Sequence, residues 1–278
     1  MIGSLQTGVS GLQQFQEDLQ VIGNNIANVN TVGYKSATMD FEDQLSQSLA
    51  GGAGNSMQVG EGVATGAIDS NYTQGTINST GVTTDLAVSG QGFFLVKDTS
   101  SGLTYATRDG EFNLDANGYL VNANGNRVQG LMGASPTPTD LQINSATAIA
   151  ALNDATVPAP TLQSYNINTN GQITATLSDG TSGVIGQFVL QNFTNPQALV
   201  KQGDNLYSFG SNAGPLAAPG TPNAAGLGQI QSGALESSNV DLATEMSSLI
   251  TAQRAFEANA KIITTSDEVL QDLINLKR

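Results

Sequence analysis

In SNVDLATEMSSLITAQRAFEANAKIITTSDEVLQDLINL, residues 238–276, apolar residues repeat with the period of a long amphipathic helix, and the other predicted elements follow from this one. One set recurs every seven positions, at Leu242, Leu249, Phe256, Ile263 and Leu270. A second set follows four positions after the first, at Met246, Gln253, Ala260, Asp267 and Ile274. This alternation predicts a coiled-coil seam with two polar breaks.

Neither Gly nor Pro interrupts this stretch, so we expect one helix from Ser238 to Leu276, about 58 Å long. Ser238 and Asp241 stand three residues apart, which predicts a capping pair at the helix start. A helix of this length cannot bury its apolar stripe inside one small domain, so it needs a partner.

Residues 4–28 carry the same repeat and predict the partner helix. Its apolar positions are Leu5, Val9, Leu12, Leu19, Ile22 and Ile26. Gly8, Gly11 and Gly23 each weaken this helix by about 1 kcal/mol relative to Ala, so packing must stabilise it. We expect the terminal helices to pair with each other, with other copies of the chain, or with both. The alternative is that both stripes pack on the chain's own β domain.

The middle of the chain has the pattern of antiparallel β structure. Asparagines at 24, 25 and 28 predict the end of the first helix near Asn28. Residues 36–50 indicate a short helix or an extended arm, and residues 51–66 a Gly-rich hairpin or loop. Asn-Gly and Asp-Gly turns then separate expected strands at 93–96, 104–108, 111–114, 119–121, 127–131, 172–177 and 183–191.

These elements predict an α+β fold with antiparallel β structure flanked by N- and C-terminal helices. We expect a discontinuous helical domain at 1–30 and 238–278, a linking arm or hairpin at 31–75, and a β-rich outer domain at 76–237.

Composition argues against several classes of function. The formal net charge of −14 argues against nucleic-acid and anionic-membrane partners. The chain has no His and no Cys, which excludes Ser–His–Asp and Cys–His catalysis and ordinary zinc sites. Asp115 could begin a calcium loop, but the twelfth position is Asn126 where an EF-hand needs Glu. We therefore expect no enzyme, no cofactor, no metal and no small-molecule substrate.

Both ends of the chain and two internal stretches resemble the bacterial flagellar axial proteins, the hook and rod subunits. The matching stretches are residues 10–12, 21–35, 87–94, 105–112, 233–242, 252–256, 263–270 and 273–278. Within them, the family motif after the first helix comprises Asn24, Asn25, Ala27, Asn28, Gly33 and Tyr34.

The resemblance implies that the terminal helices pair as a coiled coil in an assembled tube, with the β domains outside. It implies a helical homopolymer that contacts other axial proteins, namely the distal rod, the hook cap and the hook–filament junction. It also implies export by the flagellar type III apparatus, and we expect no cleaved signal peptide because the first residues lack a basic leader.

Within the family, the ending Leu-Ile-Asn-Leu-Lys-Arg and the Asn-Val-Asp-Leu stretch at 239–242 favour a hook subunit, a torque-transmitting joint of the extracellular hook. The length fits a distal rod protein of the basal body equally well. Two other classes remain alternatives: a secreted polysaccharide hydrolase, which needs a carboxylate pair in a cleft, and a coiled-coil adhesin, which forms a discrete trimer.

Overall fold

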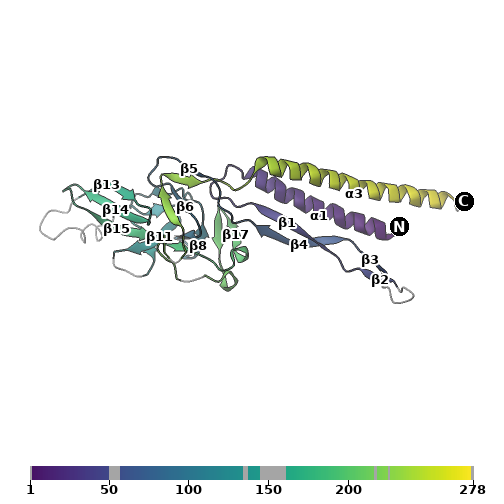
Figure 1. Cartoon of the computed structure of the whole chain (residues 1–278), viewed down its shortest axis with the longest axis horizontal. Helices are drawn as coiled ribbons and strands as arrows, with labels where there is room; N and C mark the ends of the chain where they lie inside the picture. Colours follow the sequence, from purple (N-terminus) through teal and green to yellow (C-terminus); the bar gives the residue numbers. More distant parts are fainter. Residues whose placement is uncertain are drawn as a thin grey trace. The chain divides into compact units, whose positions relative to one another are not determined.

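The computed structural model describes residues 2–49, 57–133, 137–144, 161–215, 218–224 and 226–276. It confirms the α+β class, with a helix at each end of the chain and antiparallel β structure between them (Figure 1). The chain divides into two compact units. The helical unit holds Met1–Val29, Lys35–Asn71 and Val240–Arg278, and the β unit holds Asn30–Tyr34 and Tyr72–Asn239. Among the described residues, no helix has the length and apolarity to cross a membrane.

Two long helices lie side by side in the helical unit (Figure 1). They are α1 (Ile2–Ala27) and α3 (Leu242–Leu276). The first ends where the asparagine cluster predicts, and there the Asn28 Nδ2 donates to the main-chain oxygen of Asn24 at 2.9 Å. The same oxygen accepts from the main-chain N–H of Asn28 at 3.2 Å, so Asn28 closes the last turn with both its main chain and its side chain.

The start of α3 differs from the prediction. Asp241 caps the helix, because its Oδ1 accepts hydrogen bonds from the N–H groups of Ala243 at 2.9 Å and Thr244 at 3.3 Å. The expected capping pair of Ser238 and Asp241 is therefore wrong. Ser238 and Asn239 belong to the β unit instead, where Asn239 Nδ2 donates to the main-chain oxygen of Thr73 at 3.2 Å.

A long β-hairpin completes the helical unit. Strands β1 (Ala37–Asp43) and β4 (Val63–Ser70) pair antiparallel, and β2 (Gln47–Leu49) pairs with β3 (Met57–Val59). The extended arm is thus confirmed and the short helix at 36–50 is wrong. Burial alternates along the start of β1, with Ala37 and Met39 buried and Thr38 and Asp40 exposed, which is the period of a strand.

The hairpin packs against α1. Thr65 Oγ1 donates to the Glu17 carboxylate at 2.7 Å, and the rings of Phe15 and Phe41 lie 5.5 Å apart. One side of α1 thus contacts the hairpin while another contacts α3.

One antiparallel sheet organises the β unit. Its main path runs β13 (Leu162–Ile167), β14 (Gln172–Leu177), β15 (Ser182–Phe188), β11 (Arg127–Met132), β7 (Phe93–Lys97), β8 (Thr104–Thr107), β18 (Leu206–Ser208) and β17 (Val200–Gly203). Short strands join it: β9 (Asn113–Leu114), β10 (Leu120–Val121), β12 (Thr139–Asp140) and β16 (Leu190–Gln191). Because β15 pairs with β11, the later strands continue the sheet begun by the earlier ones.

Two smaller strand pairs join distant parts of the β unit. β19 (Gln229–Ser232) pairs with β6 (Leu86–Ser89), and β20 (Ala234–Glu236) pairs with β5 (Ile77–Ser79). The last strands before α3 are therefore held by the first strands after the hairpin.

The β7 strand shows why the core has two parts. Phe94 and Val96 belong to one buried cluster, and Phe93 and Leu95 belong to another. Successive side chains of a strand point to opposite faces, so β7 contributes to apolar packing on both faces of the sheet. The few aromatic residues are concentrated here, with Phe94 and Phe112 in edge-to-face contact at 5.3 Å.

Candidate assembly interface

The contact between α1 and α3 is built on small residues of α1. A Cβ placed on Gly8 would lie 3.3 Å from Ile263 Cγ1, and one placed on Gly11 would lie 2.8 Å from Asn259 Nδ2. Both glycines are buried, and small residues let two helix backbones approach closely. The sequence interpretation treated these glycines only as a weakness of the helix. Gly8 and Gly11 stand three residues apart, on one face of the predicted helix, and this spacing is the sequence signal that could have identified the contact with α3.

The burial of α3 follows a heptad that differs from the predicted seam. Besides Ala255 and Ala260, the less exposed positions are Glu245, Leu249, Ala252, Phe256, Asn259, Ile263, Ser266 and Leu270, and we call this heptad set the inner face. The first predicted set is largely on this face, but the second buried set follows it by three residues instead of four. Gln253 and Asp267, the predicted polar breaks, are simply exposed.

The predicted interface residues fall into three groups. Ile22 is buried, and Leu5, Leu12, Leu19, Ile26, Leu249, Phe256, Ala260, Ile263 and Leu270 are half-buried. Val9, Leu242, Met246 and Ile274 are exposed, the last at 69%. The exposed members are free to contact other molecules, and their part in assembly stays a prediction.

Two further apolar patches lie along α3. The N-terminal patch is Leu242, Met246 and Ile250, spaced four residues apart. The C-terminal patch is Ile262, Val269, Leu273 and Leu276, at spacings of seven, four and three. At about 100° per residue, Ile250 and Ile262 point about 120° apart, so the patches lie on different sides of the helix. Sequence reasoning missed Ile250, Ile262, Val269 and Leu273, because none of them stands on the predicted seam.

A polar cluster joins three elements of the helical unit. The buried Asn25 amide exchanges two hydrogen bonds with the main chain of Ala37, at 2.8 and 3.0 Å, and donates to Glu245 Oε1 at 3.1 Å. This motif residue therefore ties α1 to both β1 and α3. Burial raises the pKa of the Glu245 carboxyl, and the nearby charge of Asp18 raises it further against the opposing effect of the Asn25 hydrogen bond. Burial also raises the pKa of Asp18.

The remaining motif residues have separate positions. Ala27 is exposed and Asn24 is exposed at the helix end, where its side chain accepts from Asn28 Nδ2 at 3.0 Å. Gly33 and Tyr34 belong to the β unit, and Tyr34 is buried with the Lys201 ammonium 5.2 Å from its ring centre. The motif thus serves both units along the chain and forms no single cluster.

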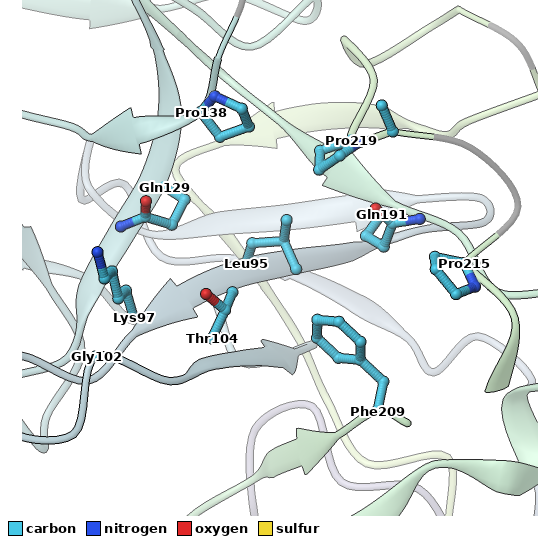
Figure 2. A pocket seen from close by; sticks show the side chains of 11 residues that line it. Leu95, Lys97, Gly102, Thr104, Gln129, Pro138, Gln191, Phe209, Pro215 and Pro219 are labelled. Carbon is cyan, nitrogen blue, oxygen red and sulfur yellow. The ribbon is translucent and has the colours of Figure 1, made fainter. Parts of the chain in front are cut away.

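The β unit also has an open pocket of about 620 Å³ (Figure 2). Its described lining includes Leu95, Lys97, Thr104, Gln129, Gln191, Phe209 and the prolines at 138, 215 and 219, and contains neither Asp nor Glu. Most glycosidases need two carboxyl groups beside the bond that they cleave, and this pocket offers none. In the adjoining pocket the one acid is Asp140, which pairs with Arg127 at 3.0 Å.

Known families match the same three regions that the sequence resemblance rests on. Residues 5–35 match the flagella basal body rod protein family, residues 87–175 the flagellar hook protein FlgE/F/G D1 domain, and residues 231–276 the flagellar basal body rod FlgEFG protein C-terminal family. These matches, on a fold with paired terminal helices and an antiparallel β unit between them in sequence, define a structural protein of the flagellar axis.

Full-length relatives agree with this class. The flagellar basal-body rod protein FlgG of Bacillus subtilis is 42% identical over all of both chains. FlgG of Agrobacterium fabrum is 36% identical over 96% of each chain. The flagellar hook protein FlgE of Borreliella burgdorferi is 29% identical over all of both chains, in an alignment of 444 positions. The chain belongs to the flagellar hook and basal-body rod protein family.

Proposed function

We propose that this chain is the distal rod subunit of the flagellar basal body and that it polymerises through α1 and α3. The uncovered apolar patches on α3 carry the proposal. The inner face already packs on α1, so the N-terminal and C-terminal patches need further helices on two other sides. In the wall of a tube, each helix has neighbouring helices on both sides, so both patches are covered. In a dimer, the partner chain would cover only one patch.

The choice of rod over hook draws on chain length as well as identity. The rod relative from Bacillus subtilis aligns over 287 positions, close to the 278 residues of this chain. The hook relative aligns over 444 positions, so it carries long segments with no counterpart here. The hook function expected from the chain's last residues is not confirmed over the rod function, and it stays the second candidate on the strength of that end-to-end match.

The proposed role implies the partners and the export route that are expected for the flagellar axial family. The subunit contacts copies of itself and the neighbouring axial proteins, and it leaves the cell through the flagellar type III apparatus. It acts mechanically and catalyses no reaction, in keeping with relatives named as rod and hook proteins.

Complementation tests rod against hook. The gene for this chain would be expressed in two strains of a flagellated bacterium, one lacking its distal rod protein and the other lacking its hook protein. Electron microscopy of purified basal bodies should show complete rods in the first strain and no hook in the second. Hooks in the second strain, with no rod completed in the first, would reverse the assignment.

A further inference from the structure

The chain passes between its two units four times. The boundaries fall after Val29, Tyr34, Asn71 and Asn239. Three stretches of the β unit therefore lead to a crossing: residues 30–34, the residues that follow Tyr72, and the residues that end at Asn239. Contacts that hold these three stretches in place therefore fix the points at which the chain leaves the β unit.

All three stretches meet at Glu236, a fully buried residue. Its main-chain oxygen accepts from the N–H of Gly33 at 2.8 Å, and its Oε1 accepts from the N–H of Gly75 at 2.9 Å. Its Oε2 forms an ion pair with Arg108 Nη1 at 3.1 Å. Glu236 itself lies three residues before the last crossing.

Besides its ion pair with Glu236, Arg108 is buried and contacts other residues of the β unit. It is 5% exposed, its Nη2 donates to the main-chain oxygen of Gly90 at 2.8 Å, and its guanidinium lies 5.1 Å from the centre of the Phe93 ring. Burial lowers the pKa of Arg108, and the charge of Glu236 opposes that effect. The charge of Glu236 thus offsets part of the cost of burying Arg108. Such buried pairs add little net stability over an apolar pair of the same volume.

Two glycines let the crossing stretches lie directly on this pair. Gly33 has a φ of 67°, and a Cβ there would lie 2.7 Å from the carbonyl carbon of Arg108. A Cβ on Gly75 would clash with the main-chain oxygen of Ser237. Any side chain would push these stretches away, so the main chain itself lies against Arg108 at Gly33 and against Ser237 at Gly75.

We propose that Glu236 and Arg108 form a buried latch that sets where the chain leaves the β unit for the helical unit. The latch determines the position of the crossing stretches. The stability of the sheet comes from its own apolar clusters. This inference holds for a rod or a hook subunit alike.

Amide hydrogen exchange by NMR on the full-length, unpolymerised chain tests the latch. In Glu236→Gln, one amide oxygen cannot accept from both Gly75 and Arg108, so one of the two loses its partner. The informative probe is the Gly33 amide, because its acceptor is main-chain oxygen that the substitution leaves in place. We expect its exchange to accelerate roughly tenfold or more, while the amides of Ile173 and Ala175 in β14 keep their wild-type rates.

Two further variants make the result decisive. Asp140→Asn breaks the Arg127 pair, which has a similar length of 3.0 Å but is about 30% exposed and lies away from the crossings, so Gly33 should keep its wild-type rate. The double variant Arg108→Met with Glu236→Leu removes both charges together but also the side-chain partners of Gly75 and Gly90, so it should melt only modestly below wild type while Gly33 still exchanges fast. Wild-type exchange of Gly33 in the double variant, or equal acceleration of Gly33 and Ile173, would overturn the latch.

Discussion

The glycines of α1 have opposite effects at different positions. Gly8 is buried against Ile263 and Asn259, whereas a Cβ on Gly23 would meet nothing within 4 Å. Ala in an open helical position lowers the entropy of the unfolded chain without any clash. Gly23→Ala should therefore stabilise α1 by about 0.5–1 kcal/mol.

Gly8→Leu should do the reverse, because a large side chain at that position forces α1 away from α3. Far-UV circular dichroism during thermal unfolding of the full chain would measure both changes. A gain of helix stability in Gly8→Leu equal to that in Gly23→Ala would show that the two helices do not touch at Gly8.

The two apolar patches of α3 predict where polymerisation is sensitive. Met246→Ser and Leu273→Ser each remove one large apolar side chain, which is worth about 1.5–3 kcal/mol when buried. The soluble subunit concentration left after assembly should rise about tenfold or more for each. Their monomers should keep the wild-type helix signal, since both side chains are more than 40% exposed.

Gln253→Ser is the control, since it puts serine at an exposed polar position of the same helix, outside both patches. It should assemble as wild type does. If both patch variants also assemble normally, α3 is not covered by neighbouring subunits and the proposed tube has another interface.

The acidic contact between α1 and α3 gives the helix pair a pH dependence. Asp18 and Glu245 both have raised pKa values in the folded chain, and residues 2–27 contain no base to compensate them. The folded pair therefore binds protons more tightly than the unfolded chain does. Its stability is greatest below the ordinary pKa values and falls as the pH rises through the raised ones.

Glu245→Gln should flatten this dependence, whereas Asp267→Asn, on the exposed side of α3, should leave its slope unchanged. Thermal unfolding followed by circular dichroism between mildly acidic and neutral pH measures the slopes. Equal slopes for wild type and Glu245→Gln would mean that Glu245 titrates normally in the folded chain.

For the whole chain, the two units should differ in protection before assembly. The β unit has apolar clusters on both faces of its sheet, whereas most of α3 is exposed and Ala252 is its one buried residue among those described. Hydrogen exchange with mass spectrometry should show faster exchange in α1 and α3 than in β7 and β14 of the monomer. In the polymer, both helices should slow to the level of the strands. Equal protection of α3 and β14 in the monomer would mean that the helices need no neighbours.

Local sequence patterns predicted most of the secondary structure and the family of this protein without any tertiary information. The heptads placed both helices, the Asn-Gly and Asp-Gly turns placed the strands between them, and the terminal motifs placed the chain in its family. These features depend on period and turn chemistry, which neighbouring residues determine. The helical reading of residues 36–50 failed because the pairing of β1 with β4 outweighed a short helical spacing.

Contacts between distant residues were decided only in the tertiary structure. The second buried set of α3 lies three residues after the first instead of four, and Asn259 of that set lies against Gly11 of α1. Likewise, nothing near Glu236 in sequence indicates its ion pair with Arg108, which is 128 positions away. Such contacts depend on which faces meet once the sheet and the helix pair have formed, and a local pattern carries no information about that choice.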